Sequence, residues 1–419
     1  MMLAERLSSP TSRGGAARSV LRLQDLVEDR MSAEDTGLVA VELFESQSRL
    51  LRPVSVESVS RHVRRRIGDA LVAGVDSSSR GIESPPADFV VGCVSITSWV
   101  SRAGGPLSYD WPEAHGAYRF SPGAGRPPFI YLLPNSPSAV DAARGLMYVS
   151  TANPAGDRFD EDYSIHQALD EMRVQLENWA LSALAEAPQP PDGLHILVDG
   201  PVVHVARAAV ETGGSRYSSS WRRLLEDRVE AVRLLERRGS TVIGVVKRVE
   251  RSRLLAAARG VERLVSSCGV EYRGAGDRAV IDAALRMGCA RWRPGSILVG
   301  PKLSVRVGGL ASKIVEYVVV PPGRWQMGPG GARVFRLEYT PETLAALRER
   351  GMEPIHIFMA DSVMRGSLEP ITIALSDRRS SSITRGLRLL LASALRGRGV
   401  PLGYSTLVEM EGDSGWRAG

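Results

Sequence analysis

The sequence predicts an α/β fold built around a mixed β-sheet. Short apolar runs typical of buried strands alternate with longer segments of helical periodicity along the 419 residues, and this alternation indicates strands interleaved with helices. Hydrophobic residues make up 43% of the chain and charged residues 24%, a balance typical of a globular protein with a sizeable core. The sequence has no internal repeat and no clear linker. We therefore expect one large domain over residues 61–419, preceded by an N-terminal helical extension over residues 1–60.

Composition excludes several classes of protein. No apolar run approaches the roughly 18 to 20 residues that a membrane-spanning helix requires, and the N-terminal MMLAERLSSPTSRGG lacks the continuous apolar core of a secretory signal. The three cysteines, Cys93, Cys268 and Cys289, are scattered and form no CxxC pair, which argues against a disulfide scaffold or a zinc knuckle. We expect a cytoplasmic protein with no membrane partner.

Two amphipathic segments precede the first strands. LRLQDLVEDRM (21–31) and GLVAVELFESQSRLL (37–51) carry apolar residues at helical spacing, so both predict short helices. ALVAGVDSSSR (70–80) then begins with an apolar run that ends at Asp76, and FVVGCVSITSWV (89–100) is a second apolar run. These two runs predict adjacent strands.

The middle of the chain alternates helices and strands. Residues 103–128 are rich in Gly and Pro and predict a long surface loop. Residues 163–186 predict a helix that the Pro-rich segment 187–193 stops. Further apolar runs predict strands at 195–201, 241–248, 296–301, 312–320 and 332–340. Further periodic segments predict helices at 221–239, where Gly239 has the character of a C-cap, and at 251–267 and 277–287. The tail holds the apolar runs IHIFMAD (355–361) and PITIALSD (370–377), the second predicted as a strand, and a last helix at 382–396.

Three apolar runs end in an aspartate where a strand is expected to stop, at Asp76, Asp199 and Asp377. Carboxylates at strand ends converge on one edge of a sheet, where they repel one another unless a divalent metal lies between them. This arrangement suits two-metal phosphodiester hydrolysis. Each aspartate taken alone is weak evidence, because Asp commonly ends strands and caps helices.

The helix before Asp199 supplies a fourth candidate carboxylate. Arg173 and Glu177 are four residues apart and share a helix face, which on a surface would be an ordinary ion pair. If that face abuts the sheet edge, Glu177 becomes a metal ligand and Arg173 its partner or a phosphate contact. Glu171 competes for the same role.

The ordered segments GVDSSSR, RVQLE, ILVDGP, VIGVVKR, VFRLEYT and EPITIALSD resemble the NurA nucleases of archaea and some bacteria. The resemblance runs from about Asp76 to the C-terminus. It implies a ribonuclease-H-like core and a metal-dependent deoxyribonuclease that acts on DNA ends in recombinational repair, with Mn2+ or Mg2+ as cofactor. It also implies exonuclease activity, with single-strand endonuclease activity left open, a homodimer, and a hexameric HerA-type ATPase as partner.

Carried over residue by residue, the resemblance makes Asp76, Glu177 and Asp199 metal ligands and catalytic residues. Lys247 matches the lysine of the family's VVKR strand, where a compact charge suits a phosphate. Asp377 stands where many members have a histidine. An aspartate still binds metal there, but it does not replace the imidazole as a neutral proton donor. The expected DNA contacts are Arg80, Arg173 and Arg248.

The charge distribution and the missing nucleotide-binding motifs bear on which other functions the sequence allows. Residues 220–310 carry 19 Lys and Arg against 9 Asp and Glu, so a polyanion is a plausible partner, although solvated helix faces would explain the same excess. One alternative is a NurA-like subunit that binds DNA or its translocase without strong catalysis. An actin-like ATPase is less favoured, because the glycine-rich phosphate turns are missing. No GxxxxGK[ST] motif occurs, so ATP-driven movement would come from a partner.

Overall fold

The computed structural model describes residues 39–408 except for the segments 46, 68–69, 100–106, 113–124, 136–144, 147, 160–162, 187–192, 205–215, 251, 267–268, 270–274, 291–292, 294, 308–310 and 321–331. The helix expected over 21–31 lies outside the described residues. None of the described helices has the length and apolar composition of a membrane-spanning helix.

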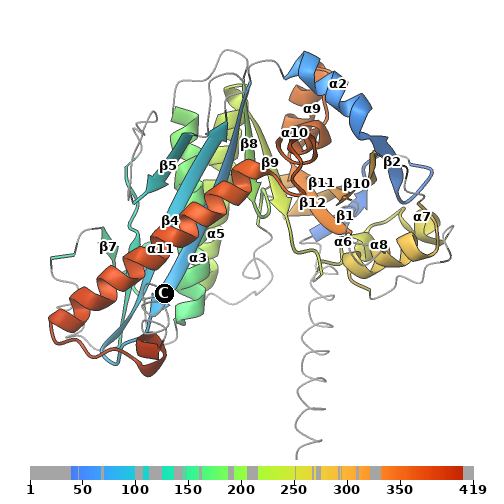
Figure 1. The fold of residues 1–419 in the computed structure, drawn as a ribbon. Helices are drawn as coiled ribbons and strands as arrows, with labels where there is room; N and C mark the ends of the chain where they lie inside the picture. Colours follow the sequence, from blue (N-terminus) through green and yellow to red (C-terminus); the bar gives the residue numbers. More distant parts are fainter. Residues whose placement is uncertain are drawn as a thin grey trace, which may run out of the picture.

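The described strands form one mixed sheet of twelve strands (Figure 1). Their order is β1-β10-β11-β12-β9-β8-β3-β4-β6-β7, with β2 paired to β10 and β5 to β4. The strands are β1 (Val39–Leu43), β2 (Arg52–Ser55), β3 (Leu71–Ile82), β4 (Ala87–Trp99), β5 (Leu107–Trp111), β6 (Ile130–Pro134), β7 (Val149–Ser150), β8 (Leu194–Asp199), β9 (Thr241–Val246), β10 (Ser296–Val307), β11 (Ala311–Val320) and β12 (Arg333–Tyr339).

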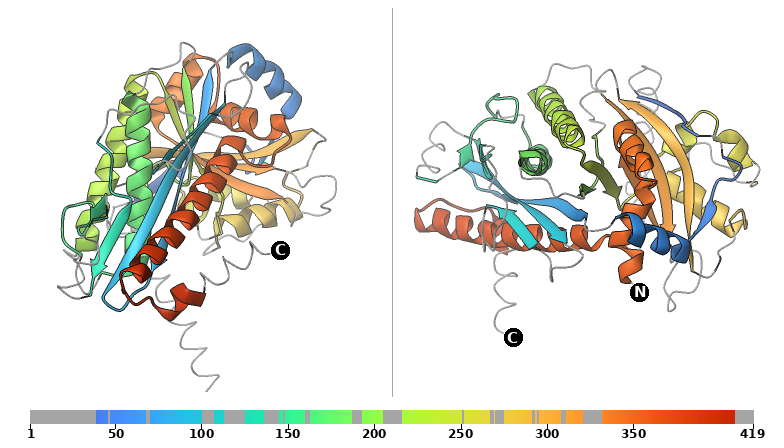
Figure 2. Two further views of the ribbon diagram at one scale, coloured as in Figure 1. Left: turned by 60° about the vertical axis from the view of Figure 1, so that its left-hand side comes forward. Right: turned by 90° about the horizontal axis from the view of Figure 1, so that it is seen from above.

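Helices cover both faces of this sheet. α3 and α5 pack against each other on one face of the part that contains β3 and β4, and α11 crosses the opposite face (Figure 2). The helices are α2 (Val56–Arg66), α3 (Ile165–Glu186), α5 (Arg216–Arg237), α6 (Leu254–Ala257), α7 (Glu262–Ser266), α8 (Asp277–Arg286), α9 (Pro341–Glu349), α10 (Pro354–Asp361) and α11 (Ile371–Gly397), with a 3-10 turn η3 at Val363–Arg365.

Strand direction divides the sheet. β3 pairs antiparallel with β4, and β4 with β6, whereas β3, β8 and β9 run parallel to one another. Helices α3 and α5 lie in the chain just before β8 and between β8 and β9, as crossovers of parallel strands require. The remaining strands from β9 to β1 pair antiparallel. The predicted α/β class with a mixed sheet is confirmed.

Local patterns explain the central elements. The first five residues of β8 and of β9 are buried, as expected for strands covered on both faces. α5 ends at Arg237, and Gly239 follows with a φ of 77°, a left-handed conformation that glycine adopts without strain. The predictions of helices at 163–186 and 221–239 are therefore confirmed, although α5 begins earlier, at Arg216.

Gly74 lets α11 lie directly on β3. A Cβ atom at this position would come within 2.4 Å of the carbonyl carbon of Thr372, at the start of α11. Any side chain would therefore push the helix away from the strand. This close approach brings the α11 side chains that face the sheet within reach of β3.

The predicted helix over 37–51 is wrong at residues 39–43, which form β1 and pair antiparallel with β10. The segment VAVEL also alternates with a period of two, and an edge of the sheet is available to it, so tertiary pairing overrides the helical pattern. β2 pairs with β10 as well, and α2 runs through residue 60. The expected boundary after residue 60 therefore falls inside a helix.

The predicted strand over 370–377 is also wrong, because α11 begins at Ile371 and continues without interruption to Gly397. Short apolar runs do not distinguish a strand from a buried helical turn. Asp377 therefore lies in the second turn of a helix. The expected strand end at Asp76 is wrong too, since β3 continues to Ile82. The predicted loop over 103–128 contains β5, and the predicted helix over 251–267 is divided into α6 and α7.

Candidate active site

A cleft of about 760 Å³ opens where β8 and β9 end, which is the usual place for a site in an open α/β sheet. Strand β3, helix α3 and the start of α11 form its other walls. We call it the acidic cleft. Its lining residues are Asp76, Ser77, Ser78, Ser79, Leu169, Asp170, Arg173, Asp199, Gly200, Val246, Lys247, Arg248, Glu369, Asp377 and Ser381.

Asp76 lines the acidic cleft from within β3 and is 2% exposed. The Ser380 hydroxyl of α11 donates a hydrogen bond of 2.9 Å to its Oδ2 atom. Burial, together with the nearby charges of Asp199 and Glu177, raises the pKa of Asp76 to about 8 against the opposing effect of the Ser380 bond. Carboxylates that repel one another in this way favour the binding of a cation.

Asp199 ends β8 and pairs with Lys247, which follows β9. The Lys247 Nζ atom lies 2.9 Å from Asp199 Oδ2 and 3.8 Å from Glu369 Oε2. Burial raises the pKa of Asp199, and Lys247 opposes that shift. Burial alone would lower the pKa of Lys247, but the two carboxylates raise it overall. The ammonium group is therefore charged and held between two carboxylates.

Glu177 is placed differently from the sequence-based expectation, because it does not line the acidic cleft. Its Oε1 atom accepts a hydrogen bond of 2.7 Å from Ser77, and its Oε2 atom accepts one of 2.6 Å from Arg228. Arg228 is fully buried, and its Nε atom donates to Asn178. Glu177 is thus a buried, paired carboxylate directly behind Asp76.

The predicted phosphate contacts separate into two groups. Arg173 and Arg248 line the acidic cleft, whereas Arg80 does not. The competing carboxylate Glu171 also lies outside the cleft lining. It accepts a hydrogen bond from Tyr163, and burial raises its pKa to about 7. Asp377 is exposed at the rim, where Ser381 donates a weak hydrogen bond of 3.4 Å to it.

Three residues of this arrangement were not predicted from the sequence: Arg228, Glu369 and Ser380. For Arg228 a signal existed, because its position lies on the buried stripe of α5 between Leu224 and Leu235. An arginine on that stripe indicates a buried ion pair. Glu369 and Ser380 carried no comparable signal.

Side chains at every fourth position of α11 hydrogen-bond to β3. Such spacing places them on one face of the helix. Three of the bonds reach backbone carbonyl groups, and one reaches the Asp76 carboxylate. They are Ser376 to Gly74 O, Ser380 to Asp76 Oδ2, Thr384 to Ser78 O and Arg388 Nε to Gly81 O.

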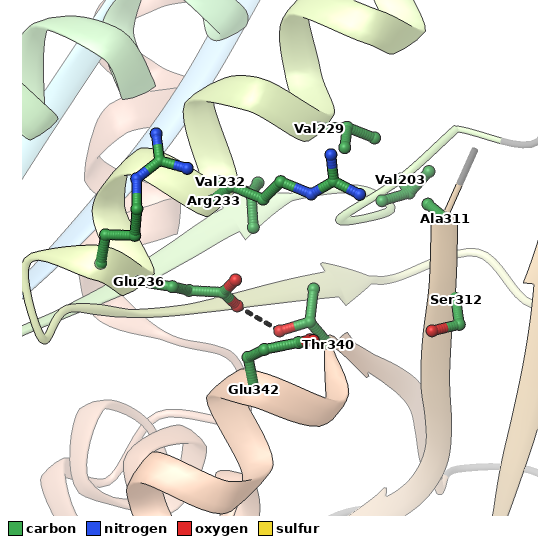
Figure 3. Close-up of a pocket in the computed structure, with 10 residues that line it drawn as sticks. Val203, Val229, Val232, Arg233, Glu236, Ala311, Ser312, Thr340 and Glu342 are labelled. Atoms are coloured by element: carbon green, nitrogen blue, oxygen red, sulfur yellow. Dashed lines mark hydrogen bonds between the residues drawn. The ribbon is translucent and has the colours of Figure 1, made fainter.

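A second pocket of about 350 Å³ lies between α5, β11 and α9 (Figure 3). Its carboxylate Glu236 is used to cap the N-terminus of α9. Glu236 accepts hydrogen bonds from Thr340 and Thr343, which lie at the N-terminus of α9. Valine side chains make up part of the wall. The acidic cleft, where several carboxylates face one opening, is therefore the better candidate for chemistry.

The acidic cleft suits a hard divalent cation by its donor chemistry. Asp76, Asp199 and Asp377 all line it, and carboxylate oxygens are the donors that Mg2+ and Mn2+ prefer. Across the part of the chain that is described, no three His, Cys, Asp or Glu side chains are already grouped closely enough to hold a metal. Asp199 is paired with Lys247, and Glu177 with Ser77 and Arg228. Metal binding would therefore require small side-chain movements.

Replacing Ser380 by alanine is expected to weaken Mn2+ binding roughly tenfold, because the Oδ2 atom of Asp76 loses the donor that orients it. Ser376→Ala is the matched control: both serines are fully buried on α11, but Ser376 bonds to the backbone of Gly74. Both variants should lose about 1 kcal/mol of unfolding free energy. Isothermal titration with Mn2+ and urea unfolding measure these effects. Equal Mn2+ affinities for the two variants would contradict the role of Ser380.

One family model matches more than half of this chain. The model of the NurA domain matches residues 70–382. A crystal structure of NurA with manganese is 10% identical, covering 91% of this chain and 99% of that chain with a TM-score of 0.39. NurA bound to dAMP and manganese is 8% identical, covering 77% and 89% with a TM-score of 0.33, and a further NurA crystal structure is 9% identical, covering 93% and 98% with a TM-score of 0.35. A search of the curated proteins finds no match.

Proposed function

Because this chain belongs to the NurA family of nucleases, we propose that it is a cytoplasmic deoxyribonuclease that uses Mn2+ or Mg2+ to hydrolyse phosphodiester bonds at DNA ends. The observation that carries the proposal is the pair of carboxylates, Asp76 and Asp199, that line one cleft; burial raises the pKa of both, and the charge of Asp199 adds to the rise at Asp76. Such a pair is costly in a folded protein unless a cation uses it.

Asp76 and Asp199 would hold the metal from β3 and β8, and Asp377 would approach it from the rim of the acidic cleft. Glu177 stays a predicted fourth ligand, with its Oε1 atom now held by Ser77. A bound divalent cation supplies Lewis-acid stabilisation of the phosphate and a water of lowered pKa.

The side chains around these carboxylates would hold the DNA backbone. Arg173 and Arg248 line the acidic cleft and provide positive charge for phosphates. Ser77, Ser78 and Ser79 line the acidic cleft and are small, so a phosphate could approach β3 closely. Arg80 remains a predicted DNA contact that would act outside the cleft.

The finer parts of the proposal rest on family membership. We assign the expected ribonuclease-H-like core to β3, β4, β6, β8, β9 and α3, because three antiparallel strands are followed there by two parallel ones, as in that fold class. We also propose exonuclease action in recombinational repair, a homodimer, and a HerA-type hexameric ATPase as partner. The absence of a P-loop motif from the sequence is consistent with a separate motor.

Digestion of linear DNA tests the proposal. We expect a linear duplex to be degraded with Mn2+ or Mg2+ and to persist in excess EDTA, because the proposed ligands are all oxygen atoms. A closed circular duplex of the same sequence is the matched control for end dependence, and a circular single strand tests endonuclease action. Undiminished digestion in EDTA would exclude the metal mechanism. Tight DNA binding without cleavage under any metal would favour a binding subunit.

A further inference from the structure

Lys247 occupies the place in the acidic cleft where a cation would contact Asp199. Its Nζ atom lies 2.9 Å from Asp199 Oδ2, with Glu369 Oε2 at 3.8 Å on the other side. All three side chains are between 21% and 28% exposed, so solvent screens the contacts only partly. Lysine is rare in this chain, with three among 53 basic residues. A compact ammonium on a flexible stem can change partners in a way that a planar guanidinium cannot.

We propose that the Lys247 ammonium acts as the resident cation of Asp199 in the metal-free protein, and that Glu369 receives this ammonium when a divalent ion takes its place. Glu369 is then a positioning residue that acts through Lys247. The inference rests on the proposed function, because it assumes a metal at Asp199.

Charge and distance support the exchange. Two cations on the same carboxylate oxygen repel each other strongly in a partly buried cleft, so Lys247 must leave Asp199 Oδ2 when a metal arrives there. Glu369 is already near, and a movement of about 1 Å would bring the ammonium to hydrogen-bond distance from it.

The backbone beside Glu369 makes it a suitable receiver. Pro370 follows Glu369 and precedes the first turn of α11, so its ring limits the local backbone. The backbone of Glu369 is therefore restricted, and its side chain lines the acidic cleft beside Lys247. After the exchange the ammonium remains inside the cleft, where a phosphate of the substrate would lie.

Glu369 could instead be a metal ligand, and a double-mutant cycle separates the two roles. If Glu369 acts through Lys247, its replacement has no effect once Lys247 is gone. If Glu369 binds the metal directly, its replacement weakens Mn2+ binding whether or not Lys247 is present.

The experiment measures Mn2+ affinity by isothermal titration and by electron paramagnetic resonance, at one pH and ionic strength and without DNA. Lys247→Met should raise the affinity roughly tenfold, because the competing cation is removed. Glu369→Gln should lower it several-fold, because the ammonium loses its second partner. The double variant should match Lys247→Met. Lys247→Gln gives an independent test of the same sign if the methionine variant does not fold.

Lys302→Met is the matched control. Lys302 also bridges two carboxylates, with its Nζ atom 2.8 Å from Glu353 and 3.3 Å from Glu45, but it does not line the acidic cleft. This variant should leave the Mn2+ affinity unchanged. A gain in Mn2+ affinity there equal in size to the gain in Lys247→Met would show that only net charge matters and would overturn the inference.

The remaining outcomes separate the inference from the proposed function. Unchanged or lowered affinity in Lys247→Met would overturn the exchange while leaving a metal-dependent nuclease intact. A double variant that binds Mn2+ several-fold more weakly than Lys247→Met would make Glu369 a ligand and overturn its role through Lys247. Wild-type protein that binds no Mn2+ at millimolar concentration would remove the proposed function and the inference together.

Discussion

Replacing Asp76 by asparagine is expected to lower the rate of DNA cleavage at least about a thousandfold, because the variant keeps the shape of the side chain but removes the charge that would hold the metal. Asp76 lines the acidic cleft, and its Oδ2 atom accepts a hydrogen bond from Ser380. Cleavage of linear DNA, measured across a range of Mn2+ concentrations, gives the effect. High Mn2+ should restore little activity.

The matched control for this prediction is Asp361→Asn. Asp361 is also a buried aspartate whose pKa is raised by burial, but it lies on α10, outside the cleft lining, and accepts hydrogen bonds from Thr372. Asp361→Asn should keep wild-type cleavage per folded molecule. Wild-type rates in Asp76→Asn would show that the buried carboxylate is structural and would contradict the proposed metal site.

Asp76→Asn should also change how the unfolding free energy of the metal-free protein depends on pH. The pKa of Asp76 is about 8 in the folded protein against 3.8 for an ordinary carboxyl. Between those pH values Asp76 keeps its proton in the folded state and has lost it in the unfolded state. The unfolding free energy therefore falls as pH rises from about 4 to about 8. Asp76→Asn should lack that part of the decline and should be more stable than wild type at pH 8. Urea unfolding in EDTA measures both.

Replacing Arg228 by methionine is expected to cost about 3–5 kcal/mol of unfolding free energy, because it leaves a buried carboxylate without its counter-ion. Arg228 is 0% exposed, and its Nη2 atom lies 2.6 Å from Glu177 Oε2. Asn178 would lose a hydrogen bond as well. Denaturant unfolding in the absence of metal measures the loss.

Two further variants make the result specific. Arg233→Met, at an exposed position of the same helix α5, should change stability by less than about 0.5 kcal/mol. The double variant Arg228→Met with Glu177→Leu should recover much of the loss, because an apolar pair replaces the buried charges. If Arg228→Met were as stable as wild type, the buried ion pair would not matter to the fold.

The central elements were predictable because their signals are local. β8 and β9 are continuous apolar runs, α3 is a long periodic segment, and a glycine with positive φ follows α5. Neighbouring residues decide such patterns. Two segments, 39–43 and 371–377, were compatible with both a helical and a strand pattern, and their packing partners determined which one forms. The first segment pairs with β10 and is a strand, whereas the second packs on the face of β3 and is a helix.

Local sequence patterns were sufficient for the family resemblance, for the mixed α/β class and for the presence of Asp76, Asp199 and Lys247 near strands that run together. What these residues contact became known from the packing of distant elements. Arg228 meets Glu177 across 51 residues of chain, and Ser380 meets Asp76 across 304. Burial, ion pairing and pKa depend on which distant elements pack together, and no spacing within a single segment records that.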